Sequence, residues 1–329
     1  MKRRLGAVFA VCMLAGTAAA QVALTAADSL GRNDPAQRLT REWLAGIEAR
    51  ASGLLGLTYF PDEQLVKAKD MLDAAQNGVA DIVHLVSNHV TDRLPLVSVF
   101  ALPSPNARAD MARLGAAAWA LVRSPGFEVA MLKQGVRPIR VVVAPPAQIV
   151  AIRPVASLDD LRGLRLRADH ATRQTAIVAL GGVAVPLPAA QVARALGQRE
   201  VDGAVVTPVA ARGLPPVTHA VRDANLGVGV TIYAMREATW QALAPAARAA
   251  VLEAGTAAVD ADARRAAAEL DAAWAALEAR GVKLHRLSDA EIGRLAAAVA
   301  PLDDAWLNLV RREPAATAVL AEWRRLVAR

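Results

Sequence analysis

Residues 157–167 read SLDDLRGLRLR, and residues 168–182 continue ADHATRQTAIVALGG. At the end of the first stretch, leucine alternates with arginine, which is the period of two that is typical of a β-strand. The second stretch predicts a helix over residues 171–180, which Gly181 is suited to end because glycine readily adopts a left-handed conformation. Arg167 is therefore expected at the carboxyl end of a strand, directly before a helix. Ligands bind at this position in open α/β sheets.

Arg167 suits such a site because a guanidinium presents a rigid fork of donors that matches a carboxylate. From the residues alone, the competing interpretation is a surface arginine on a strand, paired with a neighbour such as Asp169. Arg165 lies two residues earlier on the same face of the predicted strand, so the choice between the two arginines is also open at this point.

The first part of the chain alternates predicted strands with predicted helices. Strands are expected over residues 22–27, 55–60 and 81–85, and helices over residues 35–51 and 71–77. This order implies a parallel sheet with helices on both faces. Asp28 follows the first strand, and Ser87 and Asn88 follow the third. Because parallel strands end at the same edge, these polar side chains are expected to border one pocket.

The later part of the chain predicts a second set of strands and helices. Strands are expected over residues 137–143, 149–152, 164–167, 183–187, 201–206 and 283–286. Near residues 227–235 the chain is expected to return to the first domain. A long helical pattern runs from Ala238 to about Ala279 and is restarted by Pro245. Further helices are expected over residues 288–300 and from Leu302 onwards. Strands that alternate with helices in this way predict an α/β protein.

A resemblance to one receptor family begins with LRGLRLR at residues 161–167 and continues with LGGVAVPLPAAQVARALGQREVDGAVVTP at residues 180–208. This family comprises the solute-binding proteins of tripartite ATP-independent periplasmic (TRAP) transporters, also called the dicarboxylate-receptor family. Further segments resemble other motifs of the family in the same order: ARASGLLGLTYFPDEQL (49–65), NGVADI (77–82), RLPLVSVFALP (93–103) and VTIYAMREATWQALAPAARAAVLEAG (230–255). The resemblance covers nearly all of the chain after residue 20.

The resemblance implies a periplasmic binding protein of two α/β domains (type II-like), in which a mixed sheet in each domain is flanked by helices and one long helix spans both. The implied domain limits are residues 21–144 with 228–272 for domain I, and residues 145–227 with 273–329 for domain II. The arginine with which the family clamps the ligand carboxylate corresponds to Arg167. The resemblance further implies that a cleft closes around a small organic acid, which a TRAP membrane permease then receives.

The sequence departs from the family's pattern at two places near the expected ligand. Many members carry a second arginine at the end of the crossing strand, where this chain has Ala147 with Gln148 beside it. Many also carry an asparagine after the Asp-Gly pair at residues 202–203, where this chain offers Thr207. Fewer positive charges favour a monocarboxylate over a dicarboxylate. The candidate ligand-binding residues are thus Arg167, Asp28, Ser87, Asn88, Gln148 and Thr207, with Asp28 serving either as a turn cap or as a partner for an amino or hydroxyl group.

The first 20 residues have the pattern of a secretory signal peptide. Three basic residues at positions 2–4 precede an apolar run over residues 5–16, and three alanines at positions 18–20 form a cleavage site. The run is too short for a membrane anchor. The single cysteine, Cys12, lies within it, so the exported chain is expected to have no disulfide and no thiol chemistry. These features predict a periplasmic protein.

Several function classes lack the residues that they need. The formal net charge is +7, but arginine is scattered among acidic residues and only 4% of residues are aromatic, so nucleic-acid binding is not expected. The spacing of His84 and His89 suits no metal site, and no cysteine or acidic residue completes one. Neither a nucleophile elbow nor a dinucleotide fingerprint occurs, so no catalytic residue and no cofactor are expected. Two alternatives remain open: a secreted α/β enzyme that uses the polar cluster at residues 87–89, and the binding protein of another transporter class.

Overall fold

The computed structural model describes residues 21–31, 34–105 and 110–328, so the predicted signal peptide lies outside the described residues. A first lobe is built on a five-stranded sheet in the order β2-β1-β3-β10-β4. Its strands are β1 (Val22–Ala27), β2 (Leu55–Phe60), β3 (Ile82–Val86), β4 (Val136–Val143) and β10 (Val230–Arg236). β1 runs parallel to β2 and β3, as predicted, whereas β10 is antiparallel to β3 and β4.

The second lobe contains a six-stranded sheet in the order β11-β9-β5-β8-β6-β7. Its strands are β5 (Gln148–Ala151), β6 (Arg165–Ala168), β7 (Val183–Pro186), β8 (Gly203–Val206), β9 (His219–Arg222) and β11 (Lys283–Arg286). β6 is parallel to β7 and β8, and β5 is antiparallel to β8 and β9. β9 was not predicted, because its four residues carry no clear alternation. Two mixed sheets flanked by helices confirm the predicted fold class.

Helices cover both sheets. Those of the first lobe are α1 (Pro35–Arg50), α2 (Met71–Gln76), α3 (Ser87–Val90), α4 (Met111–Val122), α5 (Pro125–Lys133) and α9 (Glu237–Ala242). Those of the second lobe are α6 (Ala171–Ala179), α7 (Val192–Gly197), α8 (Pro208–Ala211), α11 (Asp289–Val299) and α12 (Leu302–Leu309). Short 3-10 helices lie at η1 (Ala68–Asp70), η2 (Pro95–Ala101), η3 (Leu158–Leu161) and η4 (Ala189–Gln191).

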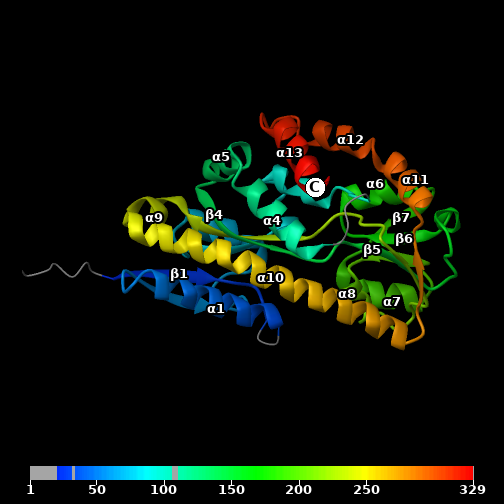
Figure 1. The fold of residues 1–329 in the computed structure, drawn as a ribbon, viewed down its shortest axis with the longest axis horizontal. Helices are drawn as coiled ribbons and strands as arrows, with labels where there is room; N and C mark the ends of the chain where they lie inside the picture. The colour runs from blue at the N-terminus through cyan, green and yellow to red at the C-terminus, as the bar shows by residue number, and fades with distance from the viewer. Residues whose placement is uncertain (1–20, 32–33, 106–109, 329) are drawn as a thin grey trace, which may run out of the picture.

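One helix, α10 (Pro245–Ala279), runs along both lobes, as predicted (Figure 1). It packs against α1, α4 and β4 of the first lobe and against α8 of the second. Gly255 permits a close approach to β4, since a Cβ at this position would overlap the carbonyl oxygen of Ile139. Proline stands at the first helical position, where it fits because the first backbone N–H has no partner within a helix.

Two chain segments, residues 144–147 and 226–229, cross between the sheets side by side. The backbone N–H of Ala144 donates to the oxygen of Gly229, and that of Ala147 donates to the oxygen of Gly227, both at 2.9 Å. Gly227 has a φ of +82°, and a Cβ there would overlap the backbone of Ala101. A larger residue would therefore disturb both the conformation of this crossing and its packing.

The last helix, α13 (Ala316–Ala328), packs on the first lobe. The sequence predicted one helical region from Leu302 to the C-terminus that closes the second domain, but a break at residues 310–315 redirects the chain, and Pro314 lies within it. α13 then contacts α4 and α5. The ring of Trp323 meets Phe100 edge-on, with ring centroids 5.0 Å apart. The C-terminal segment thus contacts both lobes, in addition to α10 and the two crossing segments.

Candidate functional site

A cavity of about 510 Å³ lies between the two lobes. Its lining comes from α1 and the end of β3 in the first lobe, from α8 in the second, from both crossing segments and from α10. Valines supply much of its wall: Val86, Val142, Val143, Val209 and Val230. A cavity of this size that combines apolar walls with several polar and charged groups suits a small-molecule ligand.

Three of the predicted site residues line this cavity. Ser87 and Asn88 enter it from α3, at the end of β3, and Thr207 enters it from the opposite lobe, between β8 and α8. Thr207 also caps α8, because its hydroxyl accepts a hydrogen bond from the backbone N–H of Ala210 at 3.2 Å. The structure therefore brings Ser87, Asn88 and Thr207 to one space, and their contact with a ligand stays a prediction.

Arg167 lies in β6, between β7 and β8, and is only 2% exposed. Its Nε donates to the carbonyl oxygen of Leu187 at 2.8 Å. Its Nη2 is buried and has no hydrogen-bond partner among the described residues. Burial lowers the pKa of Arg167, which reports the cost of keeping this charge away from water. A buried cation with an unused donor is suited to bind an anion.

The competing interpretation of Arg167, a surface arginine paired with Asp169, does not match the structure. Asp169 is paired instead with Arg173, with 3.0 Å between Oδ1 and Nη1. Arg165 is the arginine with a surface partner, since its Nε lies 3.1 Å from Oδ2 of Asp202 and its side chain is 45% exposed. The two arginines of β6 thus differ sharply in burial and in pairing.

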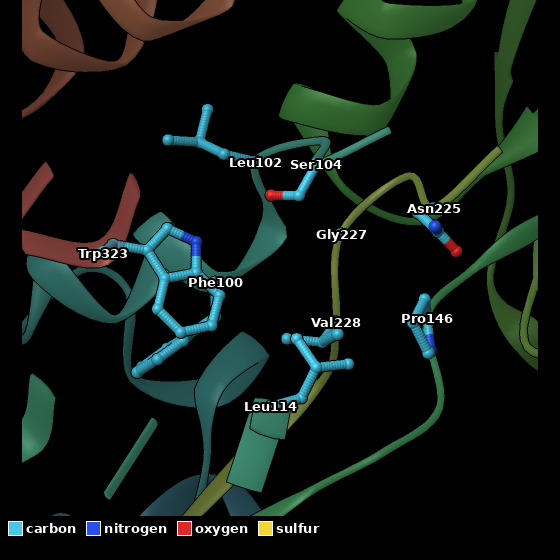
Figure 2. Close-up of a pocket in the computed structure, with 9 residues that line it drawn as sticks. All are labelled: Phe100, Leu102, Ser104, Leu114, Pro146, Asn225, Gly227, Val228 and Trp323. Carbon is cyan, nitrogen blue, oxygen red and sulfur yellow. The ribbon is translucent and has the colours of Figure 1, made fainter. Parts of the chain in front are cut away.

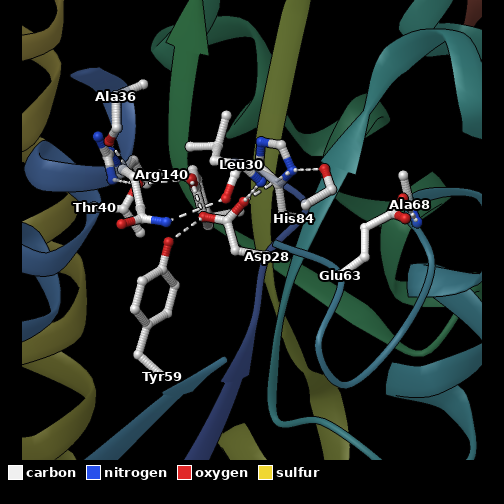
Figure 3. Close-up of polar contacts among 12 residues, drawn as sticks. Asp28, Leu30, Ala36, Thr40, Tyr59, Glu63, Ala68, His84 and Arg140 are labelled. Carbon is white, nitrogen blue, oxygen red and sulfur yellow. Dashed lines mark hydrogen bonds and ion pairs between the residues drawn. The ribbon is translucent and has the colours of Figure 1, made fainter. Parts of the chain in front are cut away.

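Asp28 is almost fully buried beneath the edge of the first sheet (Figure 3). Its Oδ2 accepts hydrogen bonds from the hydroxyls of Tyr59 and Tyr233, both at 2.9 Å. Its Oδ1 accepts one from the backbone N–H of Leu30 at 2.8 Å and lies 3.3 Å from Nδ1 of His84. These contacts tie neighbouring strands together. A ligand contact of Asp28 stays a prediction, since both of its oxygens already serve the protein in this conformation.

The groups around Asp28 have altered pKa values. Burial and the Asp28 carboxylate raise the pKa of the Tyr59 hydroxyl, which therefore remains a donor. Burial lowers the pKa of His84, and the nearby Asp28 carboxylate opposes this effect without overcoming it. The His84 imidazole is accordingly neutral at neutral pH.

Gln148, the first residue of β5, bonds to residues 224–225, which come directly before the second crossing segment. Its Nε2 donates to Oδ1 of Asn225 at 2.8 Å, and its Oε1 accepts from the backbone N–H groups of Ala224 and Asn225 at 2.9 and 3.2 Å. Gln148 is 2% exposed and is absent from the lining of the 510 Å³ cavity. Its predicted contact with a ligand is untested, whereas its contact with residues 224–225 is direct.

A second hollow lies beside the crossing segments and is lined mostly by apolar side chains (Figure 2). Trp323 and Pro146 lie on opposite sides of it. Its volume is about 10 Å³, close to the space that one water molecule needs. This hollow cannot hold an organic acid.

The sequence did not identify five charged residues near the site, and two of them, Asp34 and Arg212, line the cavity. Arg265 and Glu269 line the cavity from α10 and form an ion pair, with Nη1 and Oε2 2.6 Å apart. Arg173 of α6 is buried near Arg167, and its positive charge lowers the pKa of Arg167. The only signal for Arg265 and Glu269 is a spacing of four residues, which is common on any exposed helix.

Among the residues that the structure describes, no three or more histidine, cysteine or acidic side chains are grouped to hold a metal ion. Within the same residues, no helix is both long and apolar enough to cross a membrane.

Comparisons with known proteins agree with the fold. The sequence model of the bacterial extracellular solute-binding proteins of family 7 matches residues 26–308. A TRAP periplasmic solute-binding protein from Desulfovibrio salexigens has a similar structure, with a TM-score of 0.81 and 21% identity over 94% of this chain and 96% of that chain. A TRAP solute-binding protein from Rhodoferax ferrireducens, in complex with copurified benzoate, gives a TM-score of 0.75 and 20% identity over 94% and 98% of the two chains. The outer membrane transporter protein TsaT of Comamonas testosteroni is 23% identical over 284 residues, which are 84% of this chain and 82% of TsaT.

Proposed function

This chain belongs to family 7 of the bacterial extracellular solute-binding proteins, and we propose that it is the periplasmic receptor of a TRAP transporter, not an enzyme. In this function, the cavity between the lobes binds a small organic acid, and the crossing segments act as a hinge that closes around it. The closed receptor then delivers the acid to membrane permease subunits.

The observation that carries this proposal is the environment of Arg167. The side chain is 2% exposed, has one backbone hydrogen bond, and takes part in no ion pair within the described part of the chain. Burial of an unpaired charge costs free energy. An anion that binds beside Arg167 would offset this cost. The planar fork of the guanidinium matches a carboxylate with two parallel hydrogen bonds.

Arg167 and the cavity are connected through the second sheet. Arg167 pairs in register with Ala204 of β8, and Thr207 follows directly after that strand. The carboxyl ends of β6 and β8 therefore lie at one edge of the sheet, beside the cavity that Thr207 lines. We assign the ligand carboxylate to this edge, and its body to the valine-lined space between the lobes.

A monocarboxylate with a mainly apolar body fits this arrangement best. Valine is the most frequent residue of the cavity lining, and of the two arginines there, Arg212 and Arg265, Arg265 is already paired with Glu269. The first crossing segment ends at Ala147 and is followed by Gln148, and neither the segment nor Gln148 offers an arginine. Benzoate, which copurified with the Rhodoferax ferrireducens protein, is an acid of this kind. Ser87, Asn88 and Thr207 are proposed to contact its polar atoms.

We propose that the two domains consist of residues 21–144 with 228–272 and residues 145–227 with 273–329. The packing of α13 on α4 and α5 qualifies the second limit, because residues 316–328 contact the first lobe. When the hinge closes, α13 would therefore either move with the first lobe, on which it packs, or move with the second lobe and slide over α4 and α5.

Mass spectrometry tests the proposed function directly. Small molecules released by denaturing the purified protein should include an organic acid, and a thermal-shift screen of carboxylates should find acids that raise the melting temperature. Incubation with the same acids should leave them unchanged. Steady conversion of any of them would favour a secreted enzyme instead.

A further inference from the structure

Asp169 lies close to Arg167 but bonds to another residue. It comes one residue after β6, and the strand period of two directs its side chain to the same side as Arg167. Oδ1 of Asp169 accepts a hydrogen bond from Nη1 of Arg173 at 3.0 Å. No ion pair joins Asp169 to Arg167 in the described part of the chain.

Arg173 is itself fixed in place by the hinge. Its side chain is 8% exposed, and its Nε donates to the carbonyl oxygen of Leu226, in the second crossing segment, at 3.1 Å. The guanidinium thus holds a carboxylate with one nitrogen and the backbone with another. Because two of its nitrogens are held by hydrogen bonds, the Arg173 guanidinium has little freedom to release Asp169.

The Asp169 carboxylate would compete with a ligand if it were released. Burial opposes its ionisation, but the charges of Arg173 and Arg167 outweigh burial and lower the pKa of Asp169, so the group is ionised at neutral pH. An aspartate carboxylate and a ligand carboxylate require the same guanidinium donors. The Arg167 guanidinium cannot form its paired hydrogen bonds with both carboxylates at once.

We propose that Arg173 is a positioning residue, which holds Asp169 away from Arg167 and so keeps Arg167 available for the ligand. This inference rests on the proposed function of Arg167 as the carboxylate partner. Arg173 does not need to touch the ligand in this arrangement. Its effect on affinity passes through Asp169, and removal of the Asp169 charge should abolish that effect.

The first test is the crystal structure of the unliganded Arg173→Ala protein. We expect the Asp169 carboxylate to move to within about 4 Å of the Arg167 guanidinium, the distance of an ion pair. An Asp169 that remains apart from Arg167 in this variant would overturn the inference. This readout does not depend on which acid the protein binds.

The second test is a double-mutant comparison by calorimetric titration with benzoate as the probe. Arg173→Ala should weaken binding on the order of tenfold, and Arg173→Ala with Asp169→Asn should recover most of the loss. A loss that persists in the double variant would show that Arg173 acts on binding by a route that does not involve Asp169, and the inference would be wrong. Asp169→Asn by itself should bind benzoate at least as well as the unmodified protein, and a tenfold loss in this variant also contradicts the inference.

Arg167→Ala separates this inference from the function on which it rests. If Arg167→Ala binds benzoate as the unmodified protein does, the clamp itself is wrong. If Arg167→Ala loses affinity while the double variant shows no recovery, the clamp stands and only the positioning role of Arg173 fails. Should benzoate produce no heat with the unmodified protein, the position of Asp169 in the Arg173→Ala crystal structure decides.

Discussion

Arg140 and Asp262 form a bidentate ion pair that is buried between β4 and α10. Nε of Arg140 lies 2.9 Å from Oδ2 of Asp262, and Nη2 lies 2.7 Å from Oδ1. The Arg140 guanidinium also lies over the rings of Trp43 and Tyr233, each at 4.9 Å from the ring centroid. The pair fastens the long helix to the first sheet, so the hinge must bend elsewhere along the chain.

Removal of Asp262 should strongly destabilise the protein. Asp262→Ala leaves the Arg140 charge buried without its partner, which is expected to lower the free energy of unfolding by about 3–5 kcal/mol. Urea unfolding followed by circular dichroism measures this change. Asp159→Ala is the control, because Asp159 is exposed and pairs with Arg294 at the surface, and it should change stability little. Similar losses in both variants would contradict the anchoring role of the buried pair.

Gln148→Leu distinguishes a hinge residue from a ligand contact. The substitution leaves Asn225 and two backbone N–H groups without the Gln148 amide, so the unliganded protein should lose about 1–3 kcal/mol of unfolding free energy. A residue that acts only on the ligand would leave unliganded stability unchanged. Denaturant titration without ligand therefore decides, and an unchanged midpoint with reduced affinity would restore Gln148 as a ligand contact.

Stability should fall as the pH drops below about 6.5, partly because of His84. Burial lowers the pKa of folded His84, so the unfolded chain binds a proton there at a higher pH than the folded chain. The stability linked to neutral His84 is complete above the unfolded pKa and is lost as pH falls through the folded pKa. His84→Gln should therefore show a smaller change in melting temperature between pH 7 and pH 5 than the unmodified protein. Equal changes in melting temperature in the two proteins would show that groups other than His84 cause the loss of stability at low pH.

The sequence predicted much of the fold because local patterns determine it. The residue limits of β1, β2 and β11 agree with the predicted strands, each of which carries a clear β pattern between turn residues. Pro245 marks the start of α10 for an equally local reason. The position of α13 was not predictable in this way, since its partner Phe100 lies far away in the sequence.

The candidate site was predictable only in part. Alternation and the family resemblance predicted Arg167, the strand ends predicted Ser87, and a departure from the family's pattern suggested Thr207. Ser87 and Thr207 line the cavity, whereas Arg167 is buried and is not among the lining residues. The pairing of Arg173 with Leu226 joins a helix to a distant crossing segment, and no local pattern reports it. The face of α10 that presents Arg265 to the cavity is likewise decided by packing against both lobes.

Ligand preference follows from the charges at the site. A dicarboxylate bound at one guanidinium would leave its second carboxylate buried without a partner, which costs several kcal/mol. Benzoate and other apolar monocarboxylates should therefore raise the melting temperature more than succinate, malate or fumarate at equal concentration. If a C4-dicarboxylate gives the largest shift in the screen, a second cation that lines the cavity, Arg212 or Arg265, must take part in binding, and the inference from charge is wrong.

Calorimetric titration of Arg167→Ala with the acid that the screen identifies tests the carboxylate-receptor function most directly. The substitution leaves the ligand carboxylate buried and unpaired, which should cost about 2–5 kcal/mol, or more than tenfold in affinity. Arg167→Lys keeps the charge but loses the planar pair of donors, and it should also bind clearly less well. Arg165→Ala is the matched control, because Arg165 pairs with Asp202 on the same strand and should affect binding little. Near-normal affinity in Arg167→Ala would contradict both the clamp and the carboxylate-receptor function.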